Sequence, residues 1–165
     1  MHETRPRTIQ NDKHVKVGNQ RNKMKVVINK CYGGFSLSKE GMTAYAKHKG
    51  IQVWIEDDKK YPSLGMWTAW LVPPEQRLIQ REDEWNTMSL EERTEYNETW
   101  RTQTIYDRDI KRSDPALVAA VEEIKEVANG RCAELAIVEI PDGVDFEIEE
   151  YDGKEWVSEV HRTWG

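Results

Sequence analysis

The chain has 165 residues, a formal net charge of −6 and a mean hydropathy of −0.82, which are typical of one folded domain. No apolar run approaches the roughly eighteen residues that a membrane span needs, and residues 1–30 lack the apolar stretch of a secretory signal. We therefore exclude a membrane partner and expect a cytoplasmic protein. Cys31 and Cys132 have no neighbouring ligand residue, so we expect two small buried side chains rather than a disulfide or zinc site.

The charge is unevenly distributed along the chain. Residues 1–25 hold seven lysines or arginines and two acidic residues, which leaves a net charge of −11 for the remainder. An acidic body repels nucleic-acid phosphates, so a DNA or RNA polymer is not an expected partner. Residues 1–23 have little to bury and are predicted to form a basic, disordered tail. Residues 24–165 are predicted to form a single α+β domain.

The domain opens with a strand, a glycine loop and a helix. Residues 24–30 form a β-branched run that Gly33-Gly34 ends, and a helix capped by Ser36 or Ser38 runs to Lys49. A second strand is predicted around residues 51–55. This β-α-β opening requires a right-handed crossover if the two strands share a sheet.

Residues 56–102 are predicted to form a Trp-rich elaboration of the domain. Prolines, charged pairs and a dense set of Trp and Tyr interrupt any regular core pattern there. Ser89 and Glu92 have capping-box spacing, which predicts a helix to about Arg101 with Tyr96 and Trp100 on one face.

The last third of the chain begins with a short strand around Ile105 and a helix that Asp114-Pro115 opens and Gly130 ends. Leu117, Val121, Ile124 and Val127 should form its apolar face. Strands follow at 134–140, 146–151 and 156–160, with a type I′ turn at Asp152-Gly153. The predicted class is α+β: a small mixed or antiparallel sheet, two to three helices and a C-terminal β-meander.

The sequence lacks the common catalytic motifs. GxxxxGK[ST], GxGxxG and GxSxG are absent, and the four histidines lack metal-binding spacing. Glu147, Glu149, Glu150 and Asp152 could serve a glycosidase or a metal nuclease, although a solvated strand face explains them more simply. We expect no catalytic residue, metal or cofactor.

Two loops carry the candidate ligand-binding residues. The first offers backbone N–H groups, a hydroxyl and rings, at Tyr32, Gly33, Gly34, Phe35 and Ser36. The second brings cations and an aromatic ring to a helix start, at Tyr106, Arg108, Arg112 and Asp114. The same residues also fit a plain sharp turn and a loop of mutually paired charges. The chain has seven Trp and six Tyr, and such rings can stack on bases, fill a core or form subunit contacts. Near the C-terminus, Arg162 and Trp164 again place a cation close to an aromatic ring.

Three segments resemble a known group of small phage proteins: KVVINKCYGGFSLS at 25–38, RDIKRSDPALVAAVEE at 108–123 and ELAIVEIPDGVDFEIEEYDGKEWVSEVHRTW at 134–164. The group is the anti-Thoeris proteins of the first described type, and the likeness covers the chain from Met24 except the Trp-rich stretch. Such proteins bind cyclic ADP-ribose isomers made by bacterial TIR-domain defence enzymes and sequester them without cleavage. Some assemble from dimers into hexamers that hold cyclic trinucleotides in separate pockets.

The resemblance implies a non-enzymatic homo-oligomer that binds a cyclic ADP-ribose isomer or cyclic nucleotide in the host cytoplasm. From their chemistry, we assign the arginines to phosphates, Tyr106 or Phe35 to the base, and Asp114 or Ser36 to ribose; the arginines are Arg108, Arg112 and Arg162. Two alternatives remain: a protein-binding module that occludes a host protein, and a phosphodiesterase that depends on Glu147, Glu149 or Asp152.

Overall fold

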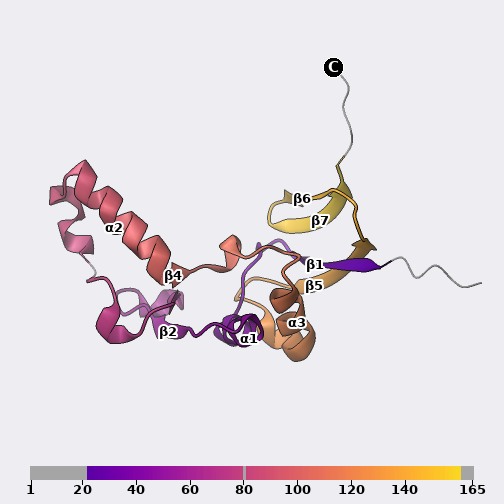
Figure 1. The fold of residues 1–165 in the computed structure, drawn as a ribbon, viewed down its shortest axis with the longest axis horizontal. Helices are drawn as coiled ribbons and strands as arrows, with labels where there is room; N and C mark the ends of the chain where they lie inside the picture. The colour runs from indigo at the N-terminus through magenta and orange to yellow at the C-terminus, as the bar shows by residue number, and fades with distance from the viewer. Residues whose placement is uncertain (1–21, 80, 161–165) are drawn as a thin grey trace, which may run out of the picture.

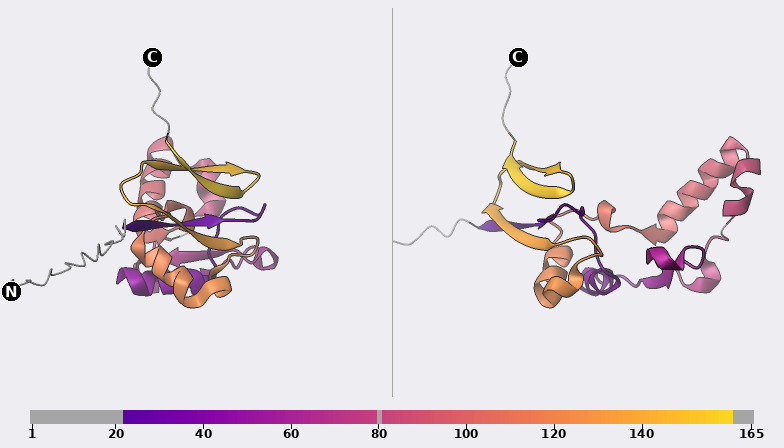
Figure 2. Two further views of the ribbon diagram at one scale, coloured as in Figure 1. Left: turned by 90° about the vertical axis from the view of Figure 1, so that its right-hand side faces the viewer. Right: turned by 180° about the vertical axis from the view of Figure 1, so that it is seen from behind.

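The computed structural model describes residues 22–79 and 81–160, and its first sheet joins the first strand to a strand more than a hundred residues later. Strand β1 (Lys23–Asn29) pairs antiparallel with β5 (Leu135–Pro141), with Val27 opposite Ile137. Helix α3 (Pro115–Ile124) packs against this pair, and α1 (Lys39–Lys49) packs against α3 (Figure 1). The hairpin of β6 (Phe146–Tyr151) and β7 (Lys154–Glu159) lies over the strand pair as a further layer (Figure 2).

The main hydrophobic core lies between the β1–β5 pair and the two helices. Apolar residues of α1 and α3 supply most of it, together with residues of β1, β3 and the connecting loops: Val27, Leu37, Met42, Ala44, Tyr45, Ala69, Ile110, Ala116, Leu117, Val118, Ala120, Val121 and Ala128. Local signals fix where the two helices begin. The Ser38 hydroxyl accepts the N–H of Gly41 at 2.9 Å, and Asp114 accepts the N–H of Ala116 at 2.9 Å.

A second sheet lies beside this core and is built by the Trp-rich segment and its flanks. It contains β2 (Trp54–Asp57), β3 (Trp67–Trp70) and β4 (Thr104–Ile105), in that antiparallel order. Helix α2 (Leu90–Gln103) rises from it, begins at the Ser89–Glu92 capping box and buries none of its residues (Figure 1). Short 3-10 helices complete the chain: η1 (Pro62–Leu64), η2 (Pro74–Gln76), η3 (Glu82–Thr87), η4 (Asp107–Asp109) and η5 (Lys125–Ala128).

The α+β class is confirmed, and so is the order strand, helix, strand at the opening, while one detail of strand pairing was predicted wrongly. Strands β1 and β2 belong to different sheets, so the condition for a right-handed crossover between them is not met. The C-terminal strands do not form a continuous meander, because β5 pairs with β1 and only β6 and β7 pair with each other. The hairpin turn itself is as predicted, since Asp152 and Gly153 have φ values of 51° and 83°.

Three smaller expectations also change. Helix α3 ends at Ile124, because Lys125 adopts φ 51° and ψ −126°, and Val127 is consequently 57 % exposed. Strand β2 starts at Trp54 rather than near residue 51. Cys31 is only half-buried and Cys132 is exposed, so neither is a core side chain.

Part of the predicted tail, residues 1–21, and the C-terminal candidate Arg162 lie outside the described residues. Among the residues described, no helix is both long and apolar enough to cross a lipid bilayer.

Candidate functional site

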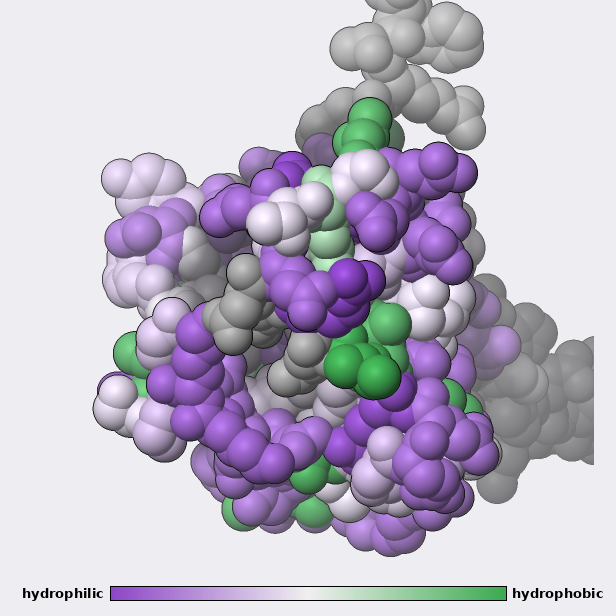
Figure 3. Space-filling view, turned by 90° about the vertical axis from the view of Figure 1, so that its left-hand side faces the viewer, coloured by the Kyte–Doolittle hydropathy of each residue, from purple (hydrophilic) through white to green (hydrophobic). Residues whose placement is uncertain are grey.

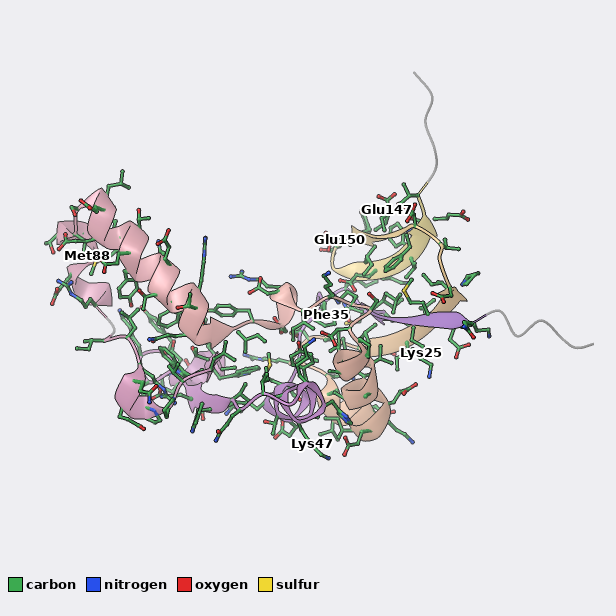
Figure 4. The ribbon with its side chains drawn as sticks, in the orientation of Figure 1. Lys25, Phe35, Lys47, Met88, Glu147 and Glu150 are labelled. Atoms are coloured by element: carbon green, nitrogen blue, oxygen red, sulfur yellow. The ribbon has the colours of Figure 1, made fainter. Side chains whose placement is uncertain are left out.

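The fold brings the two candidate loops together. The N–H of Leu37 donates to Oδ2 of Asp107 at 2.9 Å, and Cζ of Arg112 lies 3.1 Å from the centre of the Phe35 ring. Phe35 lies near the middle of the molecule, beside η4 (Figure 4). We call residues 31–37 and 106–114 together the loop junction.

Arg112 is held at the loop junction by a buried carboxylate of β7. Its Nη2 donates to Oε1 of Glu155 at 2.9 Å and its Nη1 to Oε2 at 3.3 Å, while the N–H of Asn29 donates to Oε2 at 2.8 Å. The side chains of Arg112 and Glu155 are only 18 % and 8 % exposed. Burial lowers the pKa of Arg112, although the charge of Glu155 and the hydrogen bonds to it oppose this shift. The positive charge of Arg112 is therefore already balanced by Glu155 within the protein.

The glycine loop is fixed by tight backbone contacts. The Asn29 amide donates to the carbonyls of Cys31 and Gly153 at 2.7 and 2.6 Å. A Cβ on Gly33 would lie 1.6 Å from the Cys132 carbonyl oxygen, so only glycine allows this approach. Tyr32 remains 63 % exposed, with Nζ of Lys154 5.6 Å from its ring centre. The loop thus holds the rings of Tyr32 and Phe35 at defined positions.

Asp114 and Ser36 have structural contacts at the edge of the junction. Asp114 caps α3 and accepts from Nζ of Lys49 at 2.6 Å and from the Tyr45 hydroxyl at 3.4 Å. Burial raises the pKa of Asp114, but these hydrogen bonds and the charge of Lys49 outweigh it and lower the pKa overall. The carbonyl of Ser36 accepts the N–H of Gly130 at 2.9 Å.

Arg108 is the exposed arginine of the junction, and Tyr106 beside it is half-buried. Cζ of Arg108 lies 5.0 Å from the centre of the Tyr106 ring, and the Tyr106 hydroxyl accepts the indole N–H of Trp100 at 2.7 Å. Arg108 is exposed and makes no ion pair with any other described residue. Its guanidinium is therefore available to an anion, whereas that of Arg112 is held by Glu155.

Tyr106 also lines a cavity of about 590 Å³, which we call the ring-lined cavity. Four aromatic rings and both signs of charge surround it, in a volume that suits a small ligand. The lining residues are Glu56, Asp57, Asp58, Lys59, Lys60, Met66, Trp67, Thr68, Trp70, Trp100 and Tyr106. The face of the molecule at the α2 end is mostly hydrophilic, and its apolar residues form small separate patches (Figure 3).

The rings of this region form a connected series. Trp70 and Trp100 meet edge to face at 5.0 Å, and Trp100 stacks on Tyr96 at 6.3 Å. Cζ of Arg77 lies 5.0 Å from the Trp70 ring centre, and its Nη1 donates to Glu56 at 2.5 Å. The Trp70 indole N–H is buried and has no partner among the described residues, which costs about 1–3 kcal/mol.

Sequence patterns identified Tyr106, Arg108, Phe35 and Arg112 as candidate ligand-binding residues. They gave no indication of the role of Glu155 or of the ring-lined cavity. The surplus of Trp between residues 54 and 100 was the available signal for the cavity, although it could not show which rings meet.

The acidic residues of β6 do not line the ring-lined cavity. Glu147 and Glu150 are exposed at the top of the hairpin, and Glu149 accepts from the hydroxyl of Ser158 on β7 (Figure 4). No group of three or more His, Cys, Asp or Glu suited to a metal ion occurs within residues 22–79 and 81–160.

The fold and the site define a small α+β protein with two fixed loops beside a ring-lined cavity. Comparison of the chain with protein-family models, curated proteins and solved structures gives no match.

Proposed function

We propose that this protein binds a cyclic ADP-ribose isomer, or a related cyclic nucleotide, and sequesters it without cleaving it. The resemblance of three segments to phage anti-Thoeris proteins suggests this ligand class. The observation that carries the proposal is that two loops 70 residues apart meet at Arg112 and Phe35, which leaves Arg108 and Tyr106 beside the ring-lined cavity.

The accessible groups match the parts of such a ligand. Arg108 supplies a guanidinium for the pyrophosphate, and the Tyr106 ring offers a face for the base. Arg112 is a positioning residue in this proposal, because Glu155 occupies its amino groups while it supports Phe35. By resemblance, the protein acts as a homo-oligomer in the cytoplasm of a bacterial host.

Recovery of the ligand tests the proposal directly. Purified protein is incubated with cyclic ADP-ribose isomers and cyclic dinucleotides or trinucleotides, separated from free ligand and then denatured, and the released species is identified by mass spectrometry. We expect an unaltered ligand in stoichiometric amount. Hydrolysed product would instead support the phosphodiesterase, and it should then disappear in Glu147→Gln or Glu149→Gln.

A matched pair of variants tests the role of Arg108. Arg108→Ala should weaken binding by at least tenfold, because it removes the accessible charge opposite the phosphates. Arg101→Ala removes another exposed arginine, from α2, and should leave affinity unchanged. Equal losses of affinity in both variants would mean that binding depends on the net charge of the protein and not on the position of Arg108.

One observation favours the alternative of a protein-binding module. Helix α2 buries none of its residues, and Leu90 at its start is 81 % exposed. This alternative predicts a specific protein partner whose binding is lost in Leu90→Asp, together with no thermal shift for any nucleotide.

A further inference from the structure

The ring-lined cavity contains no residue from the glycine loop, and of the predicted ligand-binding residues it includes only Tyr106. Trp67, Trp70 and Trp100 supply the other rings of its wall, and the first two come from β3. Its chemistry is therefore set by the second sheet and α2 rather than by the core that carries the loop junction.

Two independent observations indicate what the cavity would hold. The aromatic wall favours a flat, polarisable ring system, because such a ring can stack on indole or phenol faces. The Trp70 indole N–H, from a side chain that is 1 % exposed, is a donor without a partner among the described residues. The nitrogen has almost no exposed surface, so a ring nitrogen or carbonyl of a ligand accepts from it only after the Trp70 indole turns toward the cavity.

We propose that the ring-lined cavity is the base-binding part of the site and takes a heteroaromatic base that presents a hydrogen-bond acceptor. This inference rests on the proposed function, since Arg108 on the Tyr106 ring places the phosphate-binding end next to the cavity. The base lies against the rings of Tyr106, Trp67 and Trp100, and its acceptor edge faces Trp70, whose indole turns toward the cavity when the base binds. Base stacking alone is weak, so a free nucleoside binds at millimolar concentration and the phosphates supply most of the remaining affinity.

The test uses the indole N–H signals of the full-length protein in ¹⁵N-labelled NMR spectra. Adenosine is the first probe, cyclic ADP-ribose the second and ribose 5-phosphate the third. We expect adenosine to shift the signals of Trp67, Trp70 and Trp100, with Trp70 moving downfield as it gains an acceptor. Trp85, on η3 outside the cavity, should not move. Ribose 5-phosphate should shift none of the three cavity signals.

Variants extend the test and separate its outcomes. Trp67→Phe should weaken adenosine binding several-fold, whereas Trp85→Phe should have no effect. If cyclic ADP-ribose binds while the cavity signals stay unchanged, the base lies elsewhere and the inference is overturned, although the proposed function stands. If adenosine shifts the cavity signals but no cyclic nucleotide is retained, the base site stands and the proposed function fails. Absence of any binding overturns both.

Discussion

At the scale of single residues, the arrangement of β7 is unusual for a strand. Glu155 is buried while its neighbour Trp156 is 42 % exposed, which reverses the usual alternation of apolar and charged side chains. The reversal has a local cause, because the Asn29 N–H and the Arg112 guanidinium both require an acceptor at this point. A buried carboxylate therefore joins β1, β7 and the loop junction.

Glu155→Gln should lower the free energy of unfolding by about 2–3 kcal/mol, because it leaves the Arg112 charge buried without its counterion. Urea unfolding measures this change. Glu150→Gln alters the exposed residue opposite Glu155 in the hairpin and should change stability by less than about 0.5 kcal/mol. Equal effects of the two substitutions would contradict the structural role of Glu155.

Gly33 and Gly34 provide a second residue-level test. Gly33→Ala should destabilise the protein by about 1–3 kcal/mol, because the new Cβ collides with the Cys132 carbonyl and the loop must move. Gly34→Ala has open space around its Cβ and carries only the strain of φ +81°, about 1 kcal/mol. Unfolding midpoints and ligand retention measure both variants, and retention should be impaired only in Gly33→Ala.

At the scale of elements, the starts of helices with local signals were predicted well, whereas the end of α3 was not. Ser38, Ser89 and Asp114 cap their helices as their sequence patterns indicate. Strand partners were not predictable in the same way, because β1 and β5 are more than a hundred residues apart and no short pattern specifies their pairing. The candidate loops were identified from local composition, whereas Glu155 was missed because its importance arises only from tertiary contacts.

The end of α3 yields a prediction at this scale. Lys125 adopts φ 51° and ψ −126°, a conformation that strains a residue with a side chain. Lys125→Gly should therefore stabilise the protein by about 1 kcal/mol, measured by urea unfolding. Glu126→Gly, one residue later in η5, relieves no such strain and should destabilise by up to about 1 kcal/mol. Destabilisation by Lys125→Gly would show that this backbone conformation carries no strain.

At the scale of the whole molecule, carboxylates with lowered pKa values connect separate parts of the chain. A hydrogen bond from Lys47 is the largest cause of the lowered pKa of Glu123, and one from Lys23 lowers that of Glu139. The pKa of Asp114 is also lowered, and that of Glu92 is lowered locally by hydrogen bonds with Ser89 in the capping box. These groups stabilise the folded state while they are ionised, above their ordinary pKa values of 3.8 for Asp and 4.5 for Glu.

Stability should therefore be constant near neutral pH and fall as the pH drops through 4.5 and below. Each of these carboxyls binds a proton in the unfolded chain at a higher pH than in the folded chain, so acidification favours unfolding. Urea midpoints across a pH series measure the slope. Asp114→Asn should be less stable at pH 7 but lose less stability on acidification. If the dependence of its stability on pH equals that of the unmodified protein, Asp114 does not contribute to the acid sensitivity.

The segment that contains α2 begins and ends at neighbouring points of the second sheet, which affects how its length can vary. The chain leaves the second sheet after Trp70 and returns at Thr104, and these two residues are paired partners in adjacent strands. The intervening polypeptide thus starts and finishes at nearly the same place, as in an elongated hairpin connection. Deletions or insertions within it need not disturb the pairing of β1 with β5. Homologous chains could therefore differ greatly in length here while keeping the same core.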